Sequence, residues 1–181
     1  MSRKYKFLNK EGLYFVSFAT VYWIDVFTRP VYNDVIVNSL TYCKTNLGME
    51  LYCWCIMTNH IHLIFKAKDN NPEIILGRFK EFTSKQLVKT IESNIQESRK
   101  DWMLWMFKRA ASKSSNVSNN QFWQHHNKPI ELWSAEVIQQ KADYFHNNPV
   151  EAGYVTEPWH WRYSSAIDYA DGKGLIDIDF L

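Results

Sequence analysis

Two histidines separated by a single residue are the first side chains in this sequence that could do chemistry. His60 and His62 flank Ile61 at the start of a predicted strand. Because side chains alternate along a strand, both imidazoles project from one face and Ile61 enters the other. Two neutral imidazoles on one face can bind a divalent metal ion. Since six histidines in 181 residues give such a pair by chance roughly 0.2 times per chain, two structural histidines are the alternative.

A tyrosine and an asparagine near the C-terminal end form a second candidate pair. In a helix, Val137, Lys141, Tyr144 and Asn148 share one stripe, so Tyr144 and Asn148 lie one turn apart and face the same way. A phenol can act as a covalent nucleophile toward phosphorus, and an amide oxygen can bind a hard cation. The alternative is a half-buried packing tyrosine followed by an ordinary Asn-Pro helix end.

The first half of the chain must position the histidines. Residues 13–20 are rich in β-branched and aromatic residues and predict a strand. Pro30 begins a predicted helix that ends at Gly48. Residues 50–68 predict a β-hairpin that turns at Thr58-Asn59.

The second half must position the tyrosine. We expect a helix from Asn71-Pro72 to about Ser93, a short helix over 99–109, a Ser/Asn-rich mobile loop over 110–120 and a strand over 121–126. Ser134 can cap a last helix that runs to about Asn147 and is ended by Pro149, with Ile138, Ala142 and Phe145 on its apolar side. This order of elements predicts an α+β fold with a ferredoxin-like antiparallel sheet, helices mainly on one face and a C-terminal helix carrying the tyrosine.

Composition and charge limit the class of protein. Apolar residues make up 46% of the chain, no run of 18 apolar residues exists, and three cysteines are present. We therefore expect a single cytoplasmic domain over residues 1–181 that is neither secreted nor membrane-bound. The net charge is +3 over residues 1–30, +5 over 66–113 and −6 over 131–181, so a basic region could meet a polyanion.

Several separate motifs together resemble a known family. Met57-Thr-Asn-His-Ile-His-Leu-Ile64 resembles the His-hydrophobe-His signature of single-tyrosine HUH transposases. Phe122-Trp-Gln, the segment from Tyr144 to Gly153 and Tyr163-Ser-Ser165 resemble the branch called REP-associated tyrosine transposases. The likeness runs from about Gly12 to Tyr169. Thr58 stands where many relatives have Pro, residues 97–120 look like an insert, and residues 170–181 look like a tail.

The resemblance implies roles for the matching residues. His60, His62 and Asn148 would bind Mg²⁺ or Mn²⁺, and Tyr144 would attack a phosphodiester of single-stranded DNA next to a palindromic hairpin. The attack would leave a 5′-phosphotyrosine and a free 3′-hydroxyl, which can reverse the step.

Contacts with DNA phosphates are assigned to five basic residues, although ordinary solvated helix faces are the alternative. They are Arg78, Lys85, Lys89, Lys108 and Arg109. Unpaired bases could stack on Trp102, Trp105 or Trp123, with core packing expected for at least two of the three.

Other hypotheses stay open at this point. A metal-dependent hydrolytic nuclease would use His60 and His62 with water, and a catalytically silent nucleic-acid-binding module would keep the motifs only as architecture. A zinc site that adds Cys53 and Cys55 to the histidines is a further alternative. His146 should face away from Tyr144. The chain would act as a monomer or a homodimer, and we favour the monomer.

Overall fold

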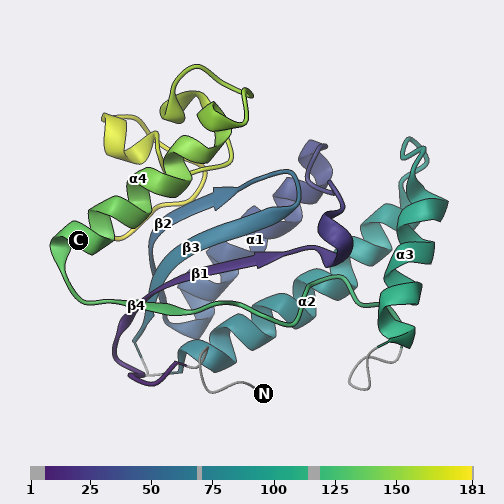
Figure 1. Cartoon of the computed structure of the whole chain (residues 1–181), viewed down its shortest axis with the longest axis horizontal. Coiled ribbons are helices and arrows are strands. Elements are labelled where there is room, and N and C mark those ends of the chain that lie inside the picture. Colours follow the sequence, from purple (N-terminus) through teal and green to yellow (C-terminus); the bar gives the residue numbers. More distant parts are fainter. Residues whose placement is uncertain (1–6, 69–70, 114–118, 181) are drawn as a thin grey trace.

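The elements follow one another as the sequence predicts. The structure is a computed structural model that describes residues 7–68, 71–113 and 119–180 (Figure 1). Its helices and strands are β1 (Leu13–Ala19), α1 (Pro30–Leu47), β2 (Met49–Ile56), β3 (His60–Ala67), α2 (Pro72–Ser93), α3 (Lys100–Ser112), β4 (Ile130–Leu132) and α4 (Ala135–Glu151). Short 3-10 turns among the described residues are η2 (Val21–Trp23), η3 (Pro158–His160) and η4 (Asp168–Ala170).

The four strands form one sheet in the order β2-β3-β1-β4, and every neighbouring pair is antiparallel. This is the strand order of a ferredoxin-like sheet, so the predicted fold class is confirmed. β3 lies inside the sheet, where His62 is opposite Ser17 of β1 on one side and Cys55 of β2 on the other. The histidine pair is therefore anchored to two neighbouring strands.

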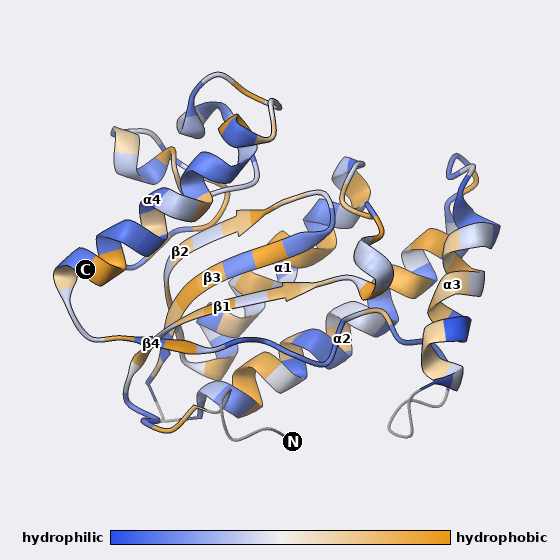
Figure 2. Ribbon diagram, viewed as in Figure 1, coloured by the Kyte–Doolittle hydropathy of each residue, from blue (hydrophilic) through white to orange (hydrophobic). Residues whose placement is uncertain are grey.

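The two faces of the sheet are covered by different helices. Ile61, Leu63 and Phe65 belong to the larger apolar core, to which α1 and α2 contribute. On the other face, Ile64 shares a smaller apolar cluster with Phe145 of α4. Figure 1 shows α1 and α2 behind the sheet and α4 on the side away from them. Along α2, hydrophobic and hydrophilic residues alternate as expected for a helix that is buried on one side only (Figure 2).

Proline and glycine residues mark the ends of the first two long helices. Pro30 is at the start of α1, and Gly48 ends that helix in the left-handed region at φ 68°. Pro72 likewise opens α2, which ends at Ser93. A proline at the first position has no intrahelical donor to lose, and glycine adopts positive φ without a steric penalty.

The strand predicted over residues 121–126 is wrong. This segment lies beside β1 through single contacts, such as Val21 N to Phe122 O at 2.8 Å and Gln124 N to Ala19 O at 2.9 Å. Phe122 and the adjacent Trp123 are both buried, but pairing with the first strand is limited to an isolated bridge between Thr20 and Trp123, so no regular ladder forms here. The regular ladder forms later along the chain, at β4.

Two predicted helix ends also differ. α3 continues to Ser112, where a loop was expected to begin at residue 110, and residues 114–118 of that loop lie outside the described part of the chain. α4 continues through Pro149 to Glu151. Proline removes one backbone donor, and the last turn still closes because Tyr154 N donates to Pro149 O at 2.9 Å.

The chain after α4 returns along the free edge of β2. Ile56 N donates to Tyr163 O at 2.8 Å, and Ser165 N donates to Trp54 O at 2.9 Å. Further on, Asp179 N donates to Leu51 O at 2.8 Å, and Ile176 is buried in the larger core. The Tyr163-Ser-Ser165 motif thus covers a sheet edge that would otherwise be unpaired. Within the described residues, none of the helices is long and apolar enough to cross a membrane.

Candidate active site

The two histidines share one face of β3, as predicted. Their ring centroids are 4.7 Å apart and the ring planes are nearly perpendicular. Ile61, between them, belongs to the core on the opposite face. The alternation of the strand therefore brings both imidazoles to the face that α4 covers.

His62 is held as a neutral, buried side chain. Its ring stacks between Phe15, with centroids 5.5 Å apart, and Phe145, at 5.8 Å. Only 4% of the residue is exposed. Burial, with smaller contributions from the neighbouring His60 and Lys141, lowers the pKa of His62 to about 3. Its Nδ1 has no hydrogen-bond partner among the described residues, so this ring is not satisfied as an ordinary core histidine.

His60 lies at the open end of the pair. Its Nδ1 is 2.7 Å from the side-chain oxygen of Asn59, and its ring meets Trp23 edge to face at 5.8 Å. Burial lowers the pKa of His60, while the charge of Asp25 opposes that change. Both histidines are therefore available as neutral nitrogen ligands near neutral pH.

The last helix delivers the tyrosine and the asparagine to this face. Ser134 caps α4 by accepting a hydrogen bond from Val137 N at 3.3 Å, which confirms the predicted helix start. Ala142 and Phe145 are buried against the sheet, which confirms the apolar side of α4. The helix is thereby fixed in rotation about its axis, and the predicted stripe turns toward the histidines.

Tyr144 and Asn148 reach His62 within the same chain. The side-chain amide of Asn148 is 3.1 Å from Nε2 of His62, and the ring centroids of Tyr144 and His62 are 6.0 Å apart. Tyr144 keeps 51% of its surface exposed, so a polymer substrate can approach it. Lys141 Nζ lies 6.0 Å from the Tyr144 ring centroid and adds a positive charge beside the phenol. The stripe pattern placed Lys141 here, but the sequence offered no signal for its role.

The residues present fit a hard divalent cation. In an octahedral site with bonds of about 2.1 Å, neighbouring ligand atoms are about 3.0 Å apart. The 3.1 Å between the Asn148 amide and His62 Nε2 matches such an edge once the amide presents its oxygen, which differs little in shape from its nitrogen. Among residues 7–68, 71–113 and 119–180, no group of three or more His, Cys, Asp or Glu side chains could hold a metal. A three-residue ligand set here therefore depends on Asn148.

The cysteines do not support a zinc site. Cys53 and Cys55 lie on the α4 face, and burial raises the pKa of both thiols, to about 11 for Cys53. Zinc binds the thiolate, which these side chains disfavour. His146 faces away from Tyr144 as expected, since its Nε2 is 2.8 Å from the hydroxyl of Ser165 and it is buried.

The five basic residues assigned to DNA are not gathered at this site. Arg78 lines a cavity of about 630 Å³ between α1 and α2, and Lys85 pairs with Glu81 at 2.6 Å. Arg78, Lys85 and the exposed Lys89 all belong to α2. This helix packs on the face of the sheet opposite the histidines. Lys108 and Arg109 belong to α3, which stands beyond one end of the sheet (Figure 1).

The expectation that at least two of the three tryptophans lie in the core is wrong. Trp123 is buried, and its Nε1 donates to Thr83 Oγ1 at 3.0 Å. Trp102 and Trp105 are 49% and 54% exposed, because α3 contacts the core mainly through Met103 and Phe107. Arg109 lies over the Trp105 ring at 5.2 Å, a pair that could meet an unpaired base.

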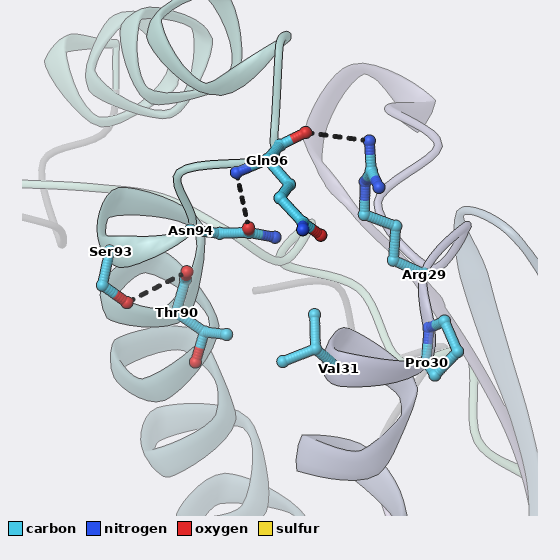
Figure 3. A pocket seen from close by; sticks show the side chains of 7 residues that line it. All are labelled: Arg29, Pro30, Val31, Thr90, Ser93, Asn94 and Gln96. Atoms are coloured by element: carbon cyan, nitrogen blue, oxygen red, sulfur yellow. Dashed lines mark hydrogen bonds between the residues drawn. The ribbon is translucent and has the colours of Figure 1, made fainter.

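Besides the cavity lined by Arg78, two further open cavities in the described part of the chain lie outside the histidine pair. One of about 480 Å³ adjoins Tyr144 and is lined by Trp159 and Tyr169 among others. The other, of about 410 Å³, lies between the start of α1 and the end of α2 (Figure 3). There Arg29 Nη2 donates to Gln96 O at 3.1 Å, and Gln96 N donates to Asn94 Oδ1 at 3.0 Å. This second cavity has none of the candidate catalytic side chains.

Comparisons with known proteins agree with the fold. The family model described as "Transposase IS200 like" matches residues 12–121. A relative from Haemophilus influenzae, provisionally named a REP-associated tyrosine transposase, is 24% identical over 165 residues, or 91% of this chain and 85% of the relative. A solved structure of a REP-associated tyrosine transposase bound to a REP hairpin has a TM-score of 0.65 at 18% identity, covering 100% of this chain and 92% of that chain. At this identity the structural likeness shows a common fold. The family match ends before α4, so the placement of Tyr144 depends on the geometry described above.

Proposed function

This chain belongs to the IS200-like transposase family, whose model matches more than half of its residues, and on that premise we propose the following reaction. The protein is a metal-dependent single-stranded DNA endonuclease and strand transferase that cleaves next to palindromic hairpins through a 5′-phosphotyrosine. The observation that carries the proposal is the convergence of Tyr144 and Asn148 on His62 within one chain.

The proposed chemical step is a reversible exchange at phosphorus. The Tyr144 oxygen forms a bond to the scissile phosphorus, the bond from phosphorus to the 3′-oxygen breaks, and that oxygen takes a proton to become a 3′-hydroxyl. The phenolic proton passes to solvent, which the half-exposed Tyr144 side chain meets directly. The 3′-hydroxyl can attack the phosphotyrosine in turn, so strands are rejoined without an external energy source.

His60, His62 and Asn148 would hold Mg²⁺ or Mn²⁺. A bound divalent cation offsets the charge that develops on the non-bridging oxygens and orients the phosphate. Because the three ligands are neutral, the ion keeps its full charge for the substrate. Lys141 supplies a second positive charge on the tyrosine side of the phosphate.

The substrate is DNA that pairs with itself into a hairpin and leaves unpaired nucleotides at its foot. The relative in the solved structure is bound to a REP hairpin, and the present chain shares its fold. We propose that the unpaired segment runs across β3 to Tyr144 and that α3, with Trp105, Lys108 and Arg109, contacts the adjoining DNA. The α2 residues Arg78, Lys85 and Lys89 would reach only DNA that passes around the sheet.

A covalent-adduct assay tests the mechanism. The protein is incubated with Mn²⁺ and a single-stranded hairpin oligonucleotide and is then run on a denaturing protein gel. We expect a slower band of protein carrying DNA, and we expect Tyr144→Phe or chelation of the metal to remove it. Tyr154→Phe, which alters an exposed tyrosine just beyond α4, is the matched control and should leave the band unchanged.

The other outcomes identify the competing functions. Cleavage that persists in Tyr144→Phe would indicate a hydrolytic nuclease that uses water. Hairpin binding by the wild type without any cleavage would indicate a silent binding module. His60→Ala should abolish cleavage and leave binding largely intact, since phosphate contacts dominate affinity.

A mixing experiment tests whether the tyrosine acts within its own chain. Tyr144→Phe and His60→Ala are each expected to be inactive, and each lacks what the other retains. If Tyr144 serves the histidines of its own chain, as in a monomer, the mixture stays inactive. Recovery of adduct in the mixture would refute this arrangement and indicate a dimer that exchanges tyrosines.

A further inference from the structure

Asp25 lies beside the histidine pair but is not one of the candidate metal ligands His60, His62 and Asn148. It is exposed and follows η2, opposite the turn that joins β2 to β3. Its Oδ1 accepts a hydrogen bond from Thr58 Oγ1 at 2.6 Å and another from Asn59 Nδ2 at 3.0 Å. Asp25 is therefore linked to His60 through the side chain of Asn59, which contacts both of them.

The orientation of the Asn59 amide follows from its neighbours. An ionised carboxylate and a backbone carbonyl can only accept hydrogen bonds. Asn59 Nδ2 faces the carboxylate of Asp25 and also Trp23 O at 3.4 Å, so the NH₂ group must lie on that side. The oxygen of the amide is then turned to His60.

The orientation of Asn59 in turn decides where the proton of His60 lies. The oxygen of Asn59 is 2.7 Å from Nδ1 of His60, and an amide oxygen offers no hydrogen. A hydrogen bond at this distance requires the proton on Nδ1. Nε2 is then left with its lone pair, which is the form that binds a metal.

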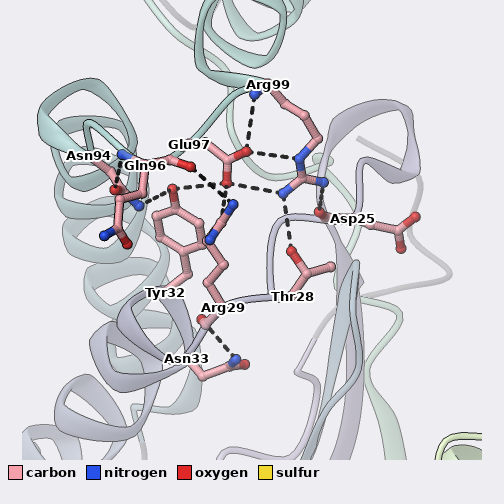
Figure 4. A network of polar contacts seen from close by, with 9 residues as sticks. All are labelled: Asp25, Thr28, Arg29, Tyr32, Asn33, Asn94, Gln96, Glu97 and Arg99. Atoms are coloured by element: carbon pink, nitrogen blue, oxygen red, sulfur yellow. Dashed lines mark hydrogen bonds and ion pairs between the residues drawn. The ribbon is translucent and has the colours of Figure 1, made fainter.

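The two loops that carry this chain of contacts are firmly held. Arg99 Nη1 donates to Asp25 O at 2.7 Å, and Arg99 itself is held by Glu97 (Figure 4). On the side of the turn, Phe27 N donates to Thr58 O at 2.8 Å. The Asp25 carboxylate is thereby kept at a fixed place relative to Asn59.

We propose that Asp25 is a positioning residue that acts through Asn59 to fix the tautomer and ring orientation of His60 with Nε2 free for a metal ion. The metal part of this inference rests on the proposed function, whereas the tautomer can be measured without metal or DNA. Loss of an outer carboxylate of this kind typically weakens metal binding or activity by about 10- to 100-fold.

The tautomer is read by two-bond ¹H–¹⁵N correlation spectra of the imidazole rings in the metal-free protein at pH 8. The His60 signals are identified by their loss in His60→Ala. In the wild type we expect the proton on Nδ1. In Asp25→Ala we expect a mixture of tautomers, because only the longer contact with Trp23 O, at 3.4 Å, then orients the Asn59 amide. Asp25→Asn is a second variant that also removes the acceptor-only group.

Thr58→Val is the matched control. It removes the other hydrogen bond to the same Asp25 oxygen, leaves the Asn59 contact and nearly preserves the side-chain shape. We expect it to keep the tautomer of the wild type. The far-UV circular dichroism spectrum and the thermal midpoint show which variants retain the fold.

The Mn²⁺ dependence of the DNA adduct gives the functional readout. The Mn²⁺ concentration for half-maximal adduct should rise about 10- to 100-fold in Asp25→Ala and stay unchanged in Thr58→Val, with most activity recovered at saturating Mn²⁺. A wild-type His60 with its proton on Nε2, or an Asp25→Ala variant with unchanged tautomer and Mn²⁺ dependence, would overturn the proposal. If the wild type forms no adduct at all, the proposed function fails, and the tautomer measurement still decides the role of Asp25.

Discussion

The buried carboxylate of Glu97 offers a stability prediction whose size can be worked out. Its side chain has no exposed surface and accepts hydrogen bonds from Arg29 Nε at 3.1 Å, Arg99 Nε at 3.0 Å and the Tyr32 hydroxyl at 3.2 Å (Figure 4). Hydrogen bonds from the Arg99 side chain are the main reason why the pKa of Glu97 is lowered from 4.5 to about 2, against the opposing effect of burial. The contacts join the segment between α2 and α3 to the loop that carries Asp25.

The pKa difference sets the free energy. One pKa unit corresponds to about 1.4 kcal/mol, so the change from 4.5 to about 2 contributes about 3 kcal/mol to the free energy of unfolding. Because the pKa is lower in the folded state, this contribution is fully present above about pH 4.5 and is lost as the pH falls toward 2. Arg29 and Arg99 keep 39% and 35% of their side-chain surface exposed, so they remain hydrated when the carboxylate is removed.

Urea unfolding of Glu97→Gln across pH tests this reasoning. At pH 7 we expect the variant to be less stable than the wild type by about 3 kcal/mol, and the difference should shrink to less than about half of that by pH 3. Glu92→Gln, which alters an exposed carboxylate on α2, is the control and should change stability little. A loss that is the same at pH 7 and pH 3, or one that Glu92→Gln reproduces, would refute the account.

Three further outcomes follow from local contacts. Gly48→Ala should cost about 1 kcal/mol of unfolding free energy in urea titrations, because Gly48 ends α1 at φ 68°. Ser165→Ala should cost about 3 kcal/mol in the same assay, because it leaves the Trp54 N–H and His146 Nε2 without their partner hydroxyl. Lys108→Ala should weaken hairpin binding and lower the slope of log affinity against log salt by about 1 in a binding titration, if α3 contacts a phosphate as proposed.

Many helix ends, the hairpin and the faces of the strands and helices can be predicted from short-range patterns in the sequence. Pro30, Gly48 and Pro72 mark helix ends, because the proline ring restricts φ and the missing Cβ of glycine permits positive φ whatever the surroundings. The hairpin around Thr58-Asn59 and the placement of both histidines on one face follow from the period of two along a strand. The stripe of Tyr144 and Asn148 follows from the helical period in the same way.

The wrong predictions concern segments whose structure depends on contacts with residues distant in the chain. Phe122 and Trp123 have the residue types of a strand, but both are buried in the larger core. The regular pairing with β1 is made by β4 instead. Pro149 looks like a helix end, yet it is buried and α4 continues to Glu151, because the last turn is still closed by hydrogen bonds from Ala152 N to Asn148 O and from Tyr154 N to Pro149 O. Trp102 and Trp105 look like core residues, and only the docking of α3 by its other side leaves them half-exposed.

The sequence by itself determined the chemical types at the site, the shared face of His60 and His62, and the shared stripe of Tyr144 and Asn148, since each depends on periodicity within one element. Only the tertiary structure decided that α4 lies on the histidine face, that Tyr144 meets His62 of its own chain, and that Asp25 reaches His60 through Asn59. Those facts depend on the packing of elements 86 residues apart, as in the pair of Asn148 with His62, which no local period encodes.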